Sequence, residues 1–88
     1  MSVNAGHRRT LAAVFADPVG ANIKWREVAA LLRALGAEIE SGRGSRVHVL
    51  LNGRPATFHR PHPRPDMDKG AVRAVRRFLL LAGCKPEG

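Results

Sequence analysis

Histidine and arginine side chains suited to phosphate chemistry gather between residues 46 and 62. His48, His59 and His62 can each donate or accept a proton near neutral pH. Arg46, in the same stretch, can stabilise the negative charge that develops on a phosphate under attack. Phosphodiester cleavage needs a group that takes a proton, a group that supplies one and a cation. Whether these four side chains lie close together depends on the secondary structure of the segments that carry them.

The dipeptide Asn52-Gly53 predicts a β-hairpin. It stands between two runs typical of strands, RVHVLL at 46–51 and RPATFH at 54–59. Asn-Gly between such runs is the strongest short hairpin signal. Because a two-residue turn sets the register of the pair, Arg46 is expected to face His59 directly.

Alternation along the two strands separates an apolar face from a polar one. The apolar side chains, expected to point toward the helices, are Val47, Val49, Leu51, Ala56 and Phe58. On the polar face, Arg46 and His59 are expected to have Cβ atoms roughly 4.5–5.5 Å apart, with His48 diagonal to both at about 7–8 Å. The spacing leaves open whether they form a phosphate-handling site or are ordinary polar residues on a solvated sheet face.

Amphipathic helices are expected on both sides of these strands. Apolar residues recur at helical spacing over 24–35, and Gly36 ends that helix. Alternation then predicts a strand at 37–41. The second helix, at 69–82, follows Asp68, which is expected to be its N-cap.

The remaining segments complete an α+β fold with the order α-β-β-β-α. Residues 10–16 are expected to form a short extra helix at the N-terminus, after a frayed end at 1–7. Residues 59–68 contain three prolines and are expected to form an ordered loop, since proline cannot donate to a sheet ladder.

Composition points to a small basic protein. A chain of 88 residues is expected to form one domain, 1–88. Lys and Arg number 15 against 7 Asp and Glu, a net charge of +8, and only three of the 15 are lysines. Arginine matches phosphate geometry and stacks on bases, which favours a nucleic-acid partner over a membrane. No apolar run reaches the roughly 20 residues of a membrane span, and the N-terminus lacks a secretory h-region, so a cytoplasmic location is expected.

Further basic side chains are expected to contact RNA. They are Arg43, Arg60, Lys69, Arg73, Arg76 and Arg77, the last three spaced i, i+3, i+4 on the final helix. A metal site at His59 and His62 is not expected, because no third ligand stands at a recognisable spacing. The one cysteine, Cys84, has no internal disulfide partner, which agrees with a reducing compartment. No cofactor is expected.

Several segments in this order resemble the HicA toxin family of bacterial ribonucleases. They are EVAALLRALGAE (27–38), GRGSRVHVLL (42–51), FHRPHP (58–63) and DKGAVRAVRRFLLLAG (68–83), and the resemblance covers about residues 22–84. It implies a fold like the double-stranded RNA-binding domain and an endonuclease that cleaves messenger RNA and stops translation. It also implies a HicB-type antitoxin that binds and silences the protein.

The resemblance implies a catalytic histidine directly after Gly-Ser, and here Gly44-Ser45 is followed by Arg46. Two interpretations follow. In the first, the catalytic histidine is His59, on the strand opposite Arg46, and His48 or His62 is the second proton-transfer group. The reaction is then independent of metal and requires the 2′-OH of RNA. Alternatively, the protein is a non-catalytic RNA-binding module, or binds only its partner. A DNA-binding regulator ranks last, since no helix-turn-helix spacing is present.

Overall fold

The computed structural model describes residues 3–20 and 22–86. Within them the chain forms α1 (Ala5–Phe15), α2 (Trp25–Ala34), β1 (Glu38–Ser41), β2 (Arg46–Leu51), β3 (Arg54–His59) and α3 (Lys69–Leu81). The expected α+β fold, α-β-β-β-α with an extra N-terminal helix, is confirmed. The predicted helix and strand ends differ from these bounds by at most one residue, except in α1.

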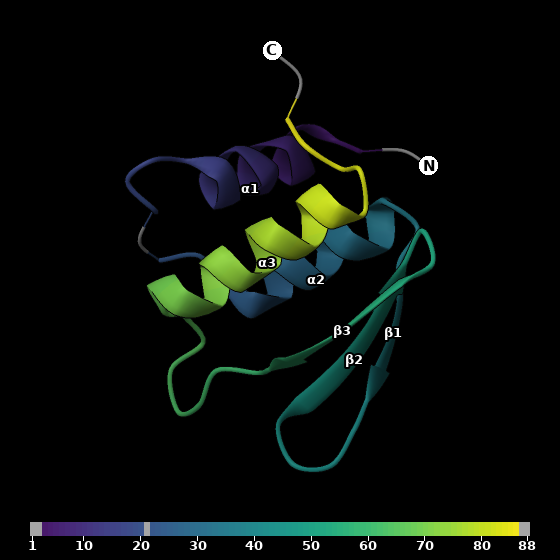
Figure 1. Cartoon of the computed structure of the whole chain (residues 1–88). Coiled ribbons are helices and arrows are strands. Elements are labelled where there is room, and N and C mark those ends of the chain that lie inside the picture. The colour runs from purple at the N-terminus through teal and green to yellow at the C-terminus, as the bar shows by residue number, and fades with distance from the viewer. Residues whose placement is uncertain (1–2, 21, 87–88) are drawn as a thin grey trace.

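The elements stack in three layers (Figure 1). The strands form one antiparallel sheet in the order β1-β2-β3. α2 and α3 lie side by side over one face of the sheet, and α1 packs on the far side of these two helices. The other face of the sheet is open. The end of the sheet that carries the β1–β2 loop extends beyond the helices.

The predicted hairpin register is confirmed over the whole of β2 and β3. Arg46 pairs with His59 and Leu51 with Arg54. Asn52 and Gly53 have φ values of 51° and 79°, the left-handed conformation that a tight two-residue hairpin turn requires. Pro55 is accommodated because β3 is an edge strand of this sheet.

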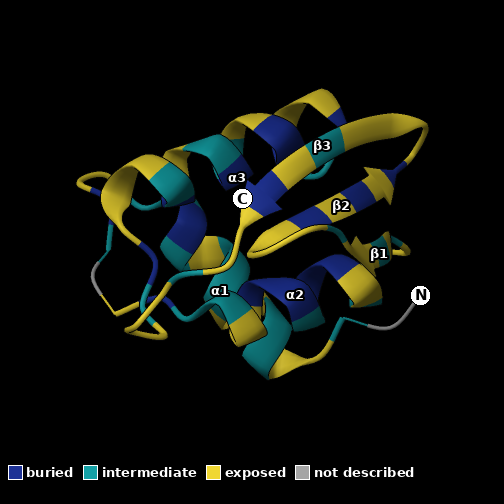
Figure 2. Cartoon of the chain, turned by 90° about the horizontal axis from the view of Figure 1, so that it is seen from below, coloured by how far each residue is buried: buried dark blue, intermediate teal, exposed yellow. Residues whose placement is uncertain are grey.

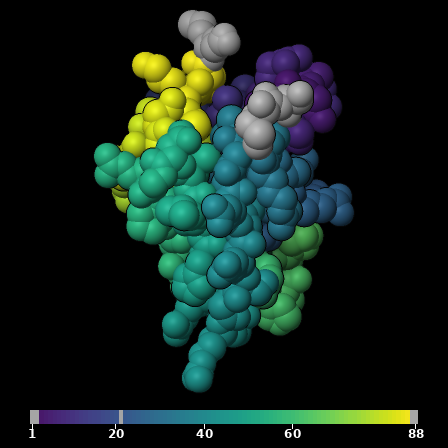
Figure 3. Space-filling model, turned by 90° about the vertical axis from the view of Figure 1, so that its right-hand side faces the viewer, coloured from purple at the N-terminus to yellow at the C-terminus, as the bar shows by residue number. Residues whose placement is uncertain are grey.

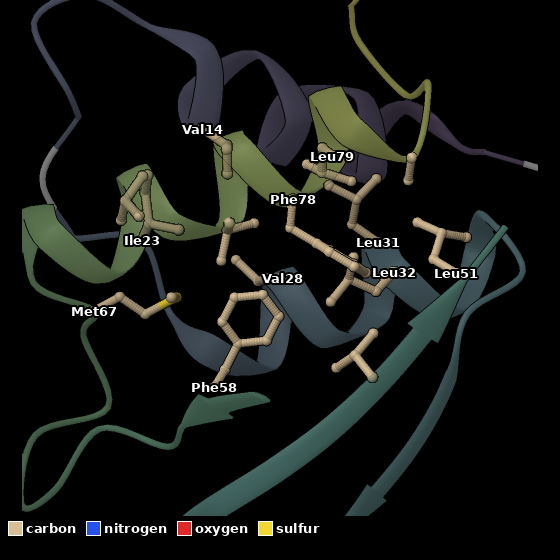
Figure 4. Packing of buried hydrophobic residues seen from close by; sticks show 14 of the residues in the cluster. Val14, Ile23, Val28, Leu31, Leu32, Leu51, Phe58, Met67, Phe78 and Leu79 are labelled. Atoms are coloured by element: carbon tan, nitrogen blue, oxygen red, sulfur yellow. The ribbon is translucent and has the colours of Figure 1, made fainter. Parts of the chain in front are cut away.

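The core lies between the sheet and the helices. Buried and exposed residues alternate along β2, as Figure 2 shows, and Val47, Val49 and Leu51 are buried as expected. Phe58 reaches from β3 toward the helices (Figure 4), and its ring lies 6.0 Å from that of Trp25 and 5.6 Å from that of Phe78, centroid to centroid. Burial of these side chains supplies the main driving force for folding.

Helix ends follow the signals in the sequence. Gly36, with φ 104°, ends α2, and the Ala37 amide donates to the Leu32 carbonyl oxygen at 2.9 Å, as in a Schellman motif. Asp68 is the N-cap of α3, its carboxylate accepting from the Ala71 amide at 2.7 Å.

The N-terminal helix is longer than predicted. It begins at Ala5 rather than Thr10, so the expectation of a frayed end is wrong for residues 5–7, while Met1 and Ser2 lie outside the described residues. The reason is a capping box in which Asn4 accepts from the His7 amide at 2.8 Å and the His7 ring accepts from the Asn4 amide at 3.2 Å. These bonds satisfy amides that would otherwise fray.

Candidate nucleic-acid interface

Arg46 and His59 lie opposite each other at the end of the β2–β3 ladder that is farthest from the tight turn. Both side chains are exposed. The Ser45 hydroxyl lies 3.4 Å from Nδ1 of His59, a long hydrogen bond that joins the Gly44-Ser45 turn to the ring. The turn belongs to the teal region that forms the narrow end of the molecule in Figure 3, away from α1. A hydroxyl and an imidazole therefore meet on an accessible surface, and the cross-strand neighbour of that imidazole is an arginine.

Arg60 fixes the turn beside His59. Its guanidinium donates to the Ser41 hydroxyl at 3.2 Å and to the Gly44 carbonyl oxygen at 3.3 Å, and its amide donates to the Ser45 carbonyl oxygen at 2.8 Å. The sequence predicts an RNA contact at Arg60, whereas these bonds give it the geometry of a brace between the β1–β2 loop and the end of β3. Arg60 is thus placed to hold Ser45 and Arg46 relative to His59.

His48 lies in the neighbouring row of the sheet, and its ring and the Cβ of Arg46 both lie next to Gly42. It pairs with Glu40 on one side and with Thr57 on the other, and its Nδ1 lies 3.1 Å from the Thr57 hydroxyl. Its Nε2 packs over Gly42, where a Cβ atom would come within 2.6 Å of that nitrogen. Both ring nitrogens of His48 therefore have neighbours within the protein.

The open sheet face also carries carboxylates that were not among the site residues predicted from the sequence. Glu38 and Glu40 alternate in β1, and together with His48 and Leu50 they line a hollow of about 520 Å³. The alternation of Glu38 and Glu40 in the sequence indicates that both side chains lie on one face of a strand. It does not indicate that they lie beside Leu50 and His48, because that depends on the β1–β2 register. Carboxylates repel phosphates, so this part of the sheet is less suited to an RNA backbone than the Arg46 end.

His62 lies in the segment between β3 and α3. Together with Gly44, Ser45 and Arg60 it lines a hollow of about 520 Å³. His62 also lines a second pocket, together with His59. The fold therefore brings His59 and His62 to one pocket, and His62 also borders the hollow at the Gly44-Ser45 turn.

The basic residues of α3 divide into two groups. Lys69, Arg73 and Arg77 are exposed. Arg76 instead packs against α1, where Nε donates to the Val14 carbonyl oxygen at 2.9 Å and an Nη to that of Ala16 at 2.7 Å. Two of its three guanidinium nitrogens are thus committed to the end of α1, so Arg76 is not among the basic groups left open to a ligand. Arg43, in the β1–β2 loop, is exposed.

Metal and membrane signals are absent from the described residues. Across 3–20 and 22–86, no three His, Cys, Asp or Glu side chains are grouped so that they would hold a metal ion. None of the helices in these ranges combines the length and apolarity needed to cross a bilayer.

Comparison with known proteins agrees with the order of elements described above. A family model, the HicA toxin of bacterial toxin–antitoxin systems, matches residues 25–83, which run from the start of α2 to the end of α3. No curated protein and no solved structure matches the chain. Because the family model covers more than half of the sequence, the chain belongs to the HicA toxin family.

Proposed function

We propose that this HicA-family toxin is a metal-independent endoribonuclease that cleaves messenger RNA and thereby inhibits translation. The observation that carries the proposal is the pairing of Arg46 with His59 beside Ser45. In the resemblance described above, the catalytic histidine directly follows Gly-Ser. Here the arginine occupies that position, and a histidine stands opposite it on the neighbouring strand.

The proposed reaction is an attack of the ribose 2′-oxygen on the adjacent phosphorus. A base removes the 2′-OH proton, the bond from phosphorus to the 5′-oxygen breaks, and an acid protonates that oxygen. The products are a 2′,3′-cyclic phosphate and a 5′-OH, so no water or metal ion enters the bond-breaking step. The need for a 2′-OH restricts the reaction to RNA.

His59 is proposed as the base and His62 as the acid. A proton on Nδ1 of His59 directed at the Ser45 hydroxyl leaves the Nε2 lone pair free to accept the proton of the 2′-OH. His62 is favoured over His48 as the second group because it borders the same pocket as His59, whereas the ring of His48 packs against Thr57 and Gly42. Arg46 stabilises the charge on the pentacoordinate phosphorus.

The RNA backbone is proposed to run across exposed basic groups on either side of this centre. Arg43 lies in the β1–β2 loop, and Lys69, Arg73 and Arg77 lie on the outer side of α3. Each would neutralise a phosphate and release a counterion, so binding is expected to weaken steeply with salt.

The partner proposed for regulation is a HicB-type antitoxin. The family membership supports such a partner, and a chain with a net charge of +8 is complementary to an acidic surface. We expect the antitoxin to cover the Arg46–His59 pair, because covering it blocks access of RNA to the proposed base.

A second candidate function is RNA binding without cleavage. The observation that favours it is Arg46 itself, which stands where the resemblance implies the catalytic histidine. The same fold and basic groups would then bind an RNA backbone without carrying out chemistry.

The two candidates are separated by incubating the purified protein with end-labelled messenger RNA in the presence of EDTA. Cleavage is expected to persist and to yield 2′,3′-cyclic phosphate ends, and a 2′-deoxy nucleotide at the cut site should block it. His59→Ala should lower the cleavage rate by about 10²- to 10⁴-fold. His48→Ala, which removes a histidine from the neighbouring row, is the matched control and should retain most activity. Binding of intact RNA with no cleavage would establish the second candidate instead.

A further inference from the structure

A pocket of about 550 Å³ lies between the end of β3, the segment that follows it, and α3. Its apolar walls include Phe58, Met67, Ala71 and Ala74. The two alanines leave space on the side of α3 that faces the pocket. A pocket of this size, with apolar walls and a few polar groups at its rim, is typical of small-molecule and nucleotide sites.

The pocket adjoins the proposed catalytic centre. The stretch 60–62 forms part of its wall and also borders the hollow that contains Gly44 and Ser45. His59 also lines the pocket. A nucleotide whose phosphate lies between Arg46 and His59 would therefore have its sugar and base next to the pocket.

The outer wall is held in place by the start of α2. The Met67 amide donates to the Ile23 carbonyl oxygen at 2.7 Å, and the Trp25 amide donates to that of Pro65 at 3.3 Å. Asp66 and Lys24 form an isolated β-bridge, and their side chains form an ion pair at 3.7 Å. The wall is thus anchored to a second element, which agrees with a preformed site.

We propose that this pocket receives one nucleobase of the bound RNA, next to the phosphate that is cleaved. The inference rests on the proposed ribonuclease function and names a subsite for it. A base has two apolar faces and a polar edge, and proteins that act on an unstacked nucleotide hold it between apolar side chains with polar groups at its edge. The apolar walls and the rim of the pocket provide both.

Asp66 gives the pocket a preference among bases. Asp66 lines the pocket, and its carboxylate, which is 37% exposed and paired with Lys24, can accept hydrogen bonds only. Adenine, cytosine and guanine carry an exocyclic amino group that donates to such an acceptor, whereas the only donor on the pairing edge of uracil, N3–H, lies between two carbonyl oxygens that a carboxylate repels. We therefore expect a base with an amino group to be preferred over uracil at this position.

The test is a binding titration with a single-stranded RNA oligonucleotide, fully 2′-O-methylated so that it cannot be cleaved, from a sequence that the protein cuts. Each nucleotide in turn is replaced by an abasic one. For the wild type, loss of the base at one position next to the cut site should weaken binding by about 5- to 150-fold. Uracil at that position should also weaken binding.

Ala74→Leu fills the pocket and should remove most of this difference, so that the intact and abasic oligonucleotides bind alike. Ala71→Leu is a second filling variant, and either one suffices if its thermal unfolding matches the wild type. Ala12→Leu, an exposed position on α1, is the matched control and should retain the full difference. Asp66→Asn should reduce the discrimination against uracil. It should leave unchanged the loss of binding that an abasic nucleotide causes.

Failure of the nucleobase pocket and failure of the ribonuclease proposal, on which it rests, give different results. If the wild type cleaves RNA but no abasic position matters, or if the abasic effect persists unchanged in a folded pocket-filling variant, the nucleobase pocket is wrong and the ribonuclease proposal stands. If the wild type neither cleaves nor binds unmodified RNA, both fall together.

Discussion

The Asn52 side-chain amide donates to the Ala82 carbonyl oxygen over 2.8 Å, which ties the β2–β3 turn to the C-terminal end of α3. The same residue has φ 51°, so it serves both the turn and the contact between the sheet and the helix. Positive φ is easier for asparagine and glycine than for other residues.

Substitutions at Asn52 should separate the contribution of the turn conformation to stability from that of the hydrogen bond to Ala82. Asn52→Gly keeps the turn conformation and loses the bond to Ala82 and a weak contact with the Cys84 sulfur at 3.9 Å, so the free energy of unfolding should fall by about 0.5–1.5 kcal/mol. Asn52→Ala also removes the short polar side chain that makes the left-handed region tolerable for asparagine, and should cost about 1–2 kcal/mol more than the glycine variant. Urea unfolding followed by the fluorescence of Trp25 measures both. Equal stability of the two variants would show that the conformation of the turn contributes little.

Arg76 should stabilise the protein through α1. Arg76→Ala removes two hydrogen bonds to carbonyl oxygens at the end of that helix, where a positive charge is also favoured by the helix dipole. The free energy of unfolding should fall by about 1–3 kcal/mol. Arg77→Ala removes an exposed charge one residue away and should change it by less than about 0.5 kcal/mol. Similar losses in both variants would contradict the assigned contact.

Arg60 should act on the rate of cleavage through the Gly44-Ser45 turn. Arg60→Ala is expected to lower kcat by about 10-fold with a smaller change in KM, because it loosens the positioning of Ser45 and Arg46 without removing either. Arg54→Ala removes the same charge at the other end of β3 and is the control. A rise in KM with kcat unchanged would show instead that Arg60 binds RNA directly.

Cys84 should react slowly with alkylating reagents. Burial raises the pKa of its thiol, since the charged thiolate is poorly solvated there. At pH 8 a smaller fraction is therefore ionised in the folded protein than in the urea-unfolded chain, and the thiolate is the reactive form. Iodoacetamide labelling followed by mass spectrometry should be slower in the folded state at pH 8, and the difference should shrink as the pH rises. Equal rates in both states would contradict the assigned environment.

The local elements and the Arg46–His59 pairing could be predicted from the sequence. A two-residue Asn-Gly turn permits only one register, and strict alternation then assigns every side chain of β2 and β3 to a face. Helix ends at Gly36 and Asp68 are likewise set by residues adjacent to them. The start of α1 was missed although its signal is also local, because Asn4 and His7 form an uncommon version of the capping box.

Only the tertiary structure showed what the arginines contact and where a pocket forms. Arg76 looked like one of three basic residues on a helix face, but its carbonyl partners lie 60 and 62 residues away in the sequence. The sequence did not indicate that Ser41 and Gly44 would lie within reach of the Arg60 guanidinium. The pocket beside α3 depends on how the segment between β3 and α3 is anchored to the start of α2. Periodicity and turn chemistry act over a few neighbouring residues, whereas these contacts exist only after distant segments have packed together.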